Sequence, residues 1–139
     1  MPPAMRSFIA VIGGMVIALT VGSMCDLVAG RLHPVPEGFD LTNAEMLRAH
    51  AAAAPTGALL VVALGWLLGP FAGGLVATRI AEHNRPLHAY AIAGILFAAT
   101  LSNLMRIPHP FWMTFAAVFG IPFAGWLAVR FAPTDGPAA

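Results

Sequence analysis

Lysine is absent from this sequence, and charged residues of all kinds make up only 9% of its 139 residues. The 7 basic residues are all arginines and are nearly balanced by 6 acidic residues, so the chain offers no strongly basic surface of the kind that binds nucleic acid. Its single cysteine, Cys25, excludes an internal disulfide and has no metal-ligand spacing around it. The chain as a whole is 59% hydrophobic, with a mean hydropathy of +0.82, which is too apolar for a soluble domain of this length.

Apolar stretches long enough to cross a bilayer occur at four places, since about 20 helical residues span about 30 Å of hydrocarbon. They cover residues 7–30, 57–80, 87–106 and 110–132 and are separated by polar, proline-containing segments. The first stretch is too long for the apolar part of a signal peptide, which has about 7 to 15 residues, so we expect it to be retained. The sequence predicts an all-α, antiparallel four-helix membrane bundle in a single domain, with a short disordered tail over residues 133–139.

Arginines in the short loops predict the orientation, because basic residues stay on the cytoplasmic side of a membrane. One face of the predicted bundle carries Arg6, Arg79, Arg85 and Arg130. The other face carries Arg31, Arg48 and Arg106, which are offset by Glu37, Asp40 and Glu45. We therefore expect both termini to be cytoplasmic.

The loop between the first two spans contains a signal for a helix start. Thr42 is followed three residues later by Glu45, which is the capping-box pattern, and Leu41 is placed to pack against Met46. A short helix over residues 43–54 should follow and lie at the membrane surface. It should end or kink before Pro55, because proline lacks an amide hydrogen and disfavours helical geometry in the residue before it.

Small residues recur every four positions in each span and so lie on one face of each helix. The stripe in the first span consists of Ala10, Gly14, Ala18, Gly22, Asp26 and Gly30. The later spans carry Gly65, Gly69, Gly73 and Ala77; Gly94, Ala98, Ser102 and Arg106; and Ala116, Gly120, Ala124 and Ala128. Because such faces let membrane helices approach closely, we expect these glycines to form the helix contacts.

Asp26 is the acid that lies inside an apolar span. A charge facing lipid at the membrane centre costs about 2.5 to 3.5 kcal/mol, so we expect Asp26 to turn toward other helices and to have a partner. The end of the third span lies at the same depth in an antiparallel bundle, which makes Arg106 the preferred partner, with Ser102 and Asn103 beside it. Arg31, five residues further along the first helix, is the alternative.

Other polar residues gather on the same side of the predicted bundle, namely His33, Arg48, His50 and His109. Histidines and an aspartate are ligand types that zinc accepts, but no HxxxH or HxH spacing supports a metal. We expect neutral imidazoles that bond to loop carbonyls, and no cofactor. Binding of a lipid head group or a metal by this cluster stays an alternative.

Pro70 and Pro122 lie inside the second and fourth spans. Each removes one backbone hydrogen bond and frees the carbonyl four residues earlier. In a small bundle such prolines are ordinary kinks, and in a transporter they line substrate sites. We expect ordinary kinks here.

The acid late in the first span is followed by "HPVPEGFD", then by "LGPFAGGLVATRIA" in the second span and by "RIPHPFW" before the fourth. This order resembles a loose set of small bacterial four-helix membrane proteins of uncharacterised function. The resemblance implies a protein of the bacterial inner membrane and no particular activity. Small multidrug transporters also have four helices and an acid in the first, but theirs is a glutamate near mid-membrane, whereas Asp26 lies nearer the edge.

Three functions fit these features. The preferred one is a non-enzymatic membrane protein, held by an Asp26–Arg106 clasp, that acts as a homo-oligomer or as an accessory subunit of a larger membrane complex. No Ser/His/Asp or Cys/His set suggests an enzyme. The second is an oligomeric transporter or channel in which Asp26 binds a proton or cation. The third is an enzyme or a small-ligand binder, for a lipid head group or a metal, that uses the polar cluster of this side, namely Asp26, His33, Arg48, His50, Asn103, Arg106 and His109.

Overall fold

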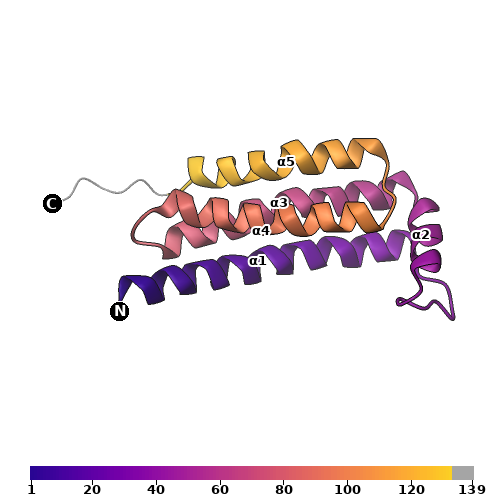
Figure 1. The fold of residues 1–139 in the computed structure, drawn as a ribbon, viewed down its shortest axis with the longest axis horizontal. Helices are drawn as coiled ribbons and strands as arrows, with labels where there is room; N and C mark the ends of the chain where they lie inside the picture. The colour runs from indigo at the N-terminus through magenta and orange to yellow at the C-terminus, as the bar shows by residue number, and fades with distance from the viewer. Residues whose placement is uncertain (133–139) are drawn as a thin grey trace.

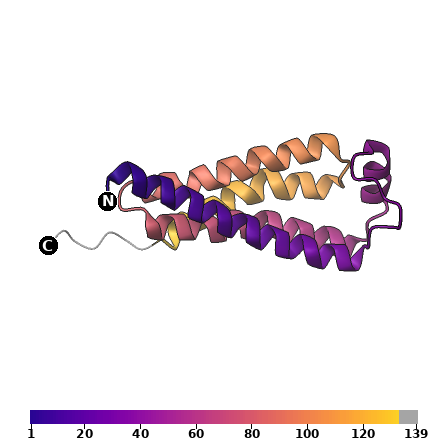
Figure 2. The same cartoon turned by 90° about the horizontal axis from the view of Figure 1, so that it is seen from below.

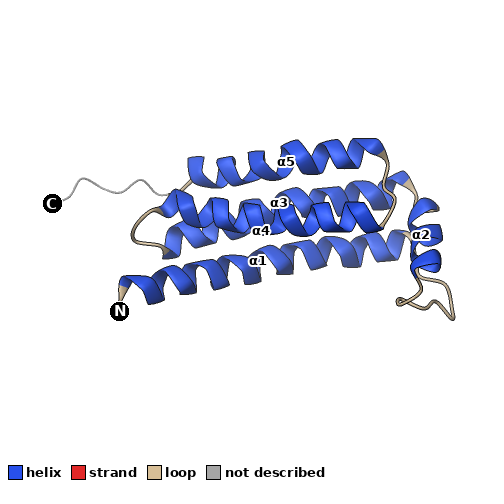
Figure 3. Ribbon diagram, viewed as in Figure 1, coloured by secondary structure: helices blue, strands red, loops and turns tan. Residues whose placement is uncertain are grey.

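The structure is a computed structural model that describes residues 1–132. The regular secondary structure in that range is helical, and the range contains no strand (Figures 1 and 3). The long helices are α1 (Pro3–Leu32), α3 (Thr56–Ile80), α4 (Arg85–Arg106) and α5 (Phe111–Arg130). All four are long and apolar enough to cross a membrane. The predicted all-α, antiparallel arrangement is confirmed, and the chain is a small multi-pass membrane protein. The disordered tail predicted for residues 133–139 lies outside the described residues.

The short helix α2 (Ala44–Ala52) lies across one end of the bundle, which we call the α2 end (Figure 1). The opposite end, called the terminal end, holds the start of α1 and the last turn of α5 (Figure 1). Prolines mark several helix starts: Pro55 and Pro110 directly precede α3 and α5, and Pro86 is the second residue of α4. Proline fits there because the first turn of a helix does not use its amide hydrogens.

α3 is the central helix, since its contacts with α1, α4 and α5 are together the most extensive in the bundle. Its most extensive contact is with α1, where the small-residue stripes of the first two spans meet. A methyl group added at Gly73 would collide with the carbonyl oxygen of Gly14, and one at Gly69 would lie 3.0 Å from the carbonyl oxygen of Ala18. Gly65 lies further along the same contact. The two backbones therefore approach as closely as glycine allows.

The stripe expected to pack in α4 lies instead on an exposed face. Gly94, Ala98, Ser102 and Arg106 are all exposed, and a methyl group at Gly94 would meet nothing within 4 Å. The residues that α4 buries are His88, Ala89, Ile92, Ala93 and Thr100. Burying the face with Ile92 gives far more packing contact than burying a stripe of glycine and alanine. α5 does pack through small residues, with Ala124 and Ala128 buried and Gly120 receiving the side chain of Leu67.

α1 packs on α3 along its whole length, from Gly13 beside Ile80 to Cys25 beside Gly65. It lies near α4 toward the terminal end, and α1 and α4 separate toward the α2 end (Figure 2). At the terminal end Arg6 holds α1 to the end of α3, because its Nε donates to the carbonyl of Ile80 at 2.8 Å and its guanidinium pairs with Glu82 at 2.5 Å. Both side chains of this ion pair are about half exposed, so it contributes at most about 1 kcal/mol.

The start of α2 differs from the prediction by one residue. Asn43 is the cap, and its Oδ1 accepts from the amides of Glu45 at 3.0 Å and Met46 at 3.2 Å. Thr42, the expected cap, is held by Asp40, whose Oδ1 accepts from its hydroxyl at 2.7 Å and its amide at 2.8 Å. These two bonds lower the pKa of Asp40, because they stabilise the carboxylate. Leu41 is 71% exposed, so the expected packing on Met46 is not formed.

Candidate functional site

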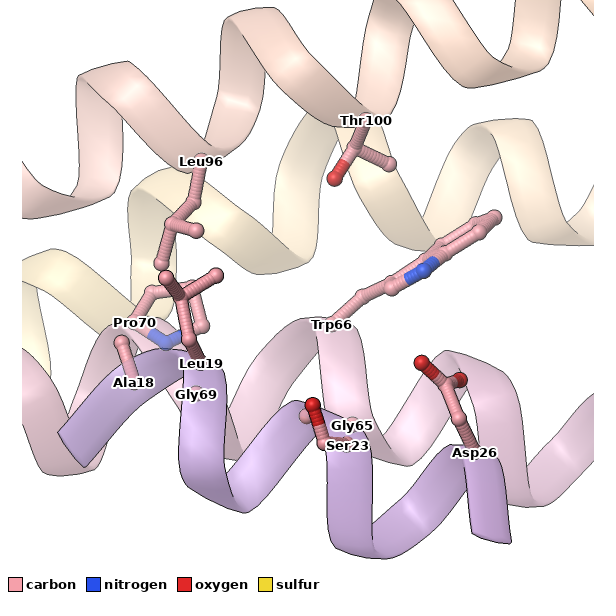
Figure 4. Close-up of a pocket in the computed structure, with 11 residues that line it drawn as sticks. Ala18, Leu19, Ser23, Asp26, Gly65, Trp66, Gly69, Pro70, Leu96 and Thr100 are labelled. Atoms are coloured by element: carbon pink, nitrogen blue, oxygen red, sulfur yellow. The ribbon is translucent and has the colours of Figure 1, made fainter. Parts of the chain in front are cut away.

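The separation of α1 from α4 leaves a cleft of about 150 Å³, and α3 forms its floor (Figure 4). α1 contributes Ser23 and Asp26, α3 contributes Trp66 and Pro70, and α4 contributes Thr100. Most of the remaining wall is aliphatic or glycine. We call this cavity the Asp26 cleft.

Asp26 projects from α1 toward the indole of Trp66 at the floor of the cleft (Figure 4). Its side chain keeps substantial exposure, because no helix covers the side of the cleft between α1 and α4. Among residues 1–132 the salt bridge joins Arg6 and Glu82, so the expected pairs of Asp26 with Arg106 or Arg31 are not formed. The carboxyl group is turned toward neighbouring helices, as expected, but has no counter-charge there.

Two features of α4 account for the missing pair. α4 is separated from α1 at this end, and its rotation presents Thr100 to the cleft while Ser102 and Arg106 face outward. Thr100 and Ser102 are two positions apart, which places them about 200° from each other around the helix. The carbonyl of Arg106 instead accepts a hydrogen bond from Nε of Arg48 at 3.4 Å. This bond links α2 to the last turn of α4.

Pro70 is fully buried and lines the Asp26 cleft one turn from Trp66. Because proline has no amide hydrogen, the carbonyl of Trp66 lacks its usual helical donor. The cleft floor therefore combines an aromatic side chain with a point where the helical hydrogen bonding of α3 is interrupted. Pro122 differs, since it is exposed on α5 and lies outside this cleft.

Ser23, Trp66 and Thr100 are cleft residues that sequence reasoning did not select. Trp66 directly follows Gly65, so the α1–α3 stripe could have pointed to a residue at the edge of that contact. Ser23 lies one turn before Asp26 at the same edge, which follows from three-residue helical spacing. Thr100 carried no signal, because its selection depends on the rotation of α4.

Histidines form a second group at the α2 end. The rings of His33 and His50 stack with centroids 4.0 Å apart, and Nε2 of His33 donates to the carbonyl of His50 at 3.0 Å. Phe39 packs edge-on against His50. Burial lowers the pKa of His50, and the nearby charge of a protonated His33 lowers it further, since both oppose a second positive charge.

His109 lies at the same end of the bundle, in the segment between α4 and α5. Its Nδ1 bonds to the carbonyl of Ile107 at 2.8 Å, and its ring is 5.5 Å from that of Trp66. His33, His50 and His109 line one cavity of about 260 Å³, which we call the histidine cavity. The expected cluster thus brings its three histidines together, while Asp26 lines the other cavity and Arg48 bonds to α4.

No group of three or more histidine, cysteine or acidic side chains within residues 1–132 is arranged to hold a metal ion. The His33 and His50 rings are stacked instead of converging on a common point. The metal alternative for this cluster has no support in the geometry of the described residues.

Comparison with known proteins leaves the family open: no family model, no curated protein and no solved structure matches this chain. The structure agrees with the resemblance to small four-helix membrane proteins only in its architecture of four long apolar helices. Function therefore has to be argued from the two cavities themselves.

Proposed function

We propose that the protein binds a proton or a small monovalent cation at Asp26 and transfers it across the membrane as an oligomeric transporter. The single observation that carries the proposal is an acid without a salt bridge among residues 1–132, placed in a cleft within the apolar part of the bundle. Acidic side chains within membrane spans are costly and typically mark ion or proton pathways. The proposed role is non-enzymatic.

Other groups around Asp26 support a cation site. Ser23 and Thr100 bring hydroxyl oxygens to the cleft, and Pro70 frees the carbonyl oxygen of Trp66. Oxygen ligands of this kind suit hard cations. The face of Trp66 adds attraction for a cation through its ring quadrupole.

The open side of the cleft supports assembly with a second copy. Four helices of this size do not enclose a path by themselves, and the cleft lacks a wall between α1 and α4. A neighbouring copy would supply that wall. As part of the proposal, the protein lies in the bacterial inner membrane with both termini in the cytoplasm.

The same open side favours a second candidate function. A partner subunit that places an arginine against Asp26 would make the cleft a structural joint, and the protein would then be an accessory subunit or a structural homo-oligomer. The two candidates differ in what neutralisation of Asp26 does. A transport site loses flux, whereas removal of one partner of a buried ion pair costs about 3 to 5 kcal/mol of stability.

Asp26→Asn distinguishes these functions. We expect purified wild-type protein in liposomes to dissipate an imposed pH gradient, as followed with an entrapped pH-sensitive dye, or an imposed potassium gradient, as followed with an entrapped potassium-sensitive dye. The Asp26→Asn variant should show only the leak of protein-free liposomes, because an amide neither takes up a proton nor balances a cation. Its thermal unfolding in detergent should match that of the wild type.

Glu37→Gln is the matched control, since Glu37 is an exposed acid in the loop before α2. It removes the same charge and should leave the flux unchanged. Equal flux in wild type and Asp26→Asn would overturn the transport proposal. A lower unfolding temperature or loss of oligomer in Asp26→Asn, with no flux in the wild type, would establish the structural role instead.

A further inference from the structure

The histidine cavity is separate from the Asp26 cleft and has a different chemistry. α2 covers it, and its walls come from the ends of α1 and α3 and from the segment between α4 and α5. Its volume of about 260 Å³ exceeds that of the Asp26 cleft. Leu47, Leu59, Val62 and Ile107 provide part of its apolar wall, and the three histidines are its polar side chains.

Backbone contacts determine which ring nitrogen of two histidines carries the hydrogen. A carbonyl oxygen only accepts, so Nε2 of His33 and Nδ1 of His109 must be the N–H groups in their bonds to His50 and Ile107. In the neutral imidazole the other nitrogen then has a lone pair and no hydrogen. His33 and His109 thus each keep one hydrogen-bond acceptor for a further partner.

The wall of the cavity carries no acid and no arginine. A cationic ligand would therefore find no acidic counter-charge, and an anionic ligand would find no guanidinium. Burial and the neighbouring His33 favour the neutral form of His50 by lowering its pKa. The ligand that suits such a wall is uncharged, donates a hydrogen bond and has an apolar body.

We propose that the histidine cavity binds a neutral amphiphile whose hydroxyl group donates to His109 or His33 while its apolar body packs on Leu59 and Val62. The cavity lies at the α2 end, where the candidate membrane spans end. In a bilayer that these helices span, this is the level where hydrocarbon gives way to polar groups. An amphiphile with a single hydroxyl head places that hydroxyl at this level of a bilayer and its apolar body in the hydrocarbon. This site goes beyond the proposed role of Asp26 and does not depend on it.

A pair of probes that differ only in the donor tests the proposal. Full-length protein in nanodiscs is titrated with 4-hexylphenol and with its methyl ether, 4-hexylanisole, and each affinity is corrected for partition into empty nanodiscs. We expect the phenol to bind about tenfold more tightly, the factor that corresponds to one net hydrogen bond of about 1.4 kcal/mol. Addition of the phenol should also change the ¹⁵N chemical shift of the histidine ring nitrogen that accepts its hydrogen bond.

His109→Phe removes one acceptor and keeps a ring against Trp66, so we expect the variant to lose most of the preference for phenol over anisole. His33→Phe provides a second test with the same expectation if the hydroxyl lies on the other side. The control is His83→Phe, at an exposed position in the α3–α4 turn, which should keep the preference. Thermal unfolding of each variant establishes that it is folded.

Equal affinity of the wild type for phenol and anisole would overturn the proposal, and this measurement needs no variant. The proposal would also fail if both phenylalanine variants kept the wild-type preference. A phenol preference that disappears in His109→Phe or His33→Phe, but not in His83→Phe, supports it.

Discussion

Gly73 shows how much of the α1–α3 contact depends on single hydrogen atoms. A methyl group there would collide with the carbonyl oxygen of Gly14 and would lie 2.7 Å from Cβ of Ala18. Backbone and Cβ atoms cannot move aside without shifting a whole helix. Gly94 is also a glycine in a stripe of small residues, but a methyl group added there would face open space.

These two glycines give a prediction with an internal control. We expect Gly73→Ala to lower the free energy of unfolding by about 1 to 3 kcal/mol, the usual cost of overpacking. Gly94→Ala should leave it unchanged or raise it by up to about 1 kcal/mol, because alanine is the better helix former. Unfolding in mixed micelles with increasing denaturing detergent measures both. Equal effects of the two substitutions would contradict the contact described here.

The glycine stripes also show what sequence could predict at the scale of residues. Spacing alone placed Gly14, Gly65, Gly69 and Gly73 on single faces of their helices, and these faces meet. Spacing could not tell which of two small faces α4 buries, since that depends on the larger neighbour Ile92. The missing Asp26–Arg106 pair has the same origin, because the rotation of α4 and its separation from α1 are properties of the packed bundle.

At the scale of elements, α2 depends on a histidine pair for its position over the α2 end. His50 lies on α2, and His33 directly follows α1. Their stacked rings and the bond from His33 to the carbonyl of His50 hold the two elements together. The cavities on either side of His50 contain His33 and His109 as titratable groups and no acid that would stabilise a second charge.

We therefore expect α2 to become less protected against hydrogen exchange as the pH falls below the ordinary histidine pKa of 6.5. The pKa of His50 is lowered in the docked state, so undocked α2 binds the proton more readily and the docked state loses stability as the pH falls. Exchange of residues 44–52, corrected for its intrinsic pH dependence, measures this.

His50→Phe keeps an aromatic ring in the stack and does not titrate, so it should weaken the change in exchange between pH 7.5 and pH 5.5. Asp40 is not responsible for this range, because its pKa is lowered from 3.8 and its stabilising bonds are lost only in more acidic solution. Unchanged exchange of wild-type α2 across this range would contradict the role of the histidine pair.

The start of α2 marks the limit of sequence patterns at this scale. Both Thr42 and Asn43 are good capping residues, and the capping-box spacing favoured Thr42. Asp40 removes Thr42 from that role by binding its hydroxyl and amide. A helix in this loop was predictable, whereas the competition among three neighbouring polar side chains was not.

At the scale of the whole molecule, four helices long and apolar enough to span the bilayer place the start of α1 and the end of α5 on the same side. The arginine distribution predicts that this side is the cytoplasm. We expect a fluorescent protein that folds only in the cytoplasm to be bright when fused to either terminus. A reporter enzyme that is active only outside the cytoplasm should be active when it is inserted at Gly38, in the exposed loop before α2.

The inverse pattern of the reporters would reverse the orientation while keeping four spans. Opposite sides for the two termini would contradict the four-span arrangement itself. Length and hydropathy were sufficient to predict this architecture, because each span must satisfy its backbone hydrogen bonds internally and so forms a helix.

The separation of α1 from α4 has a consequence for any molecule that reaches Asp26. The uncovered side of the cleft opens sideways between α1 and α4, so in a single copy inserted in a bilayer, before a neighbouring copy covers it, access from that side passes through lipid and not through bulk water. The concentration available to the carboxyl group is then set by the membrane partition coefficient of the molecule. A lipophilic weak base would arrive readily, whereas a fully hydrated ion would have to shed its water before it entered.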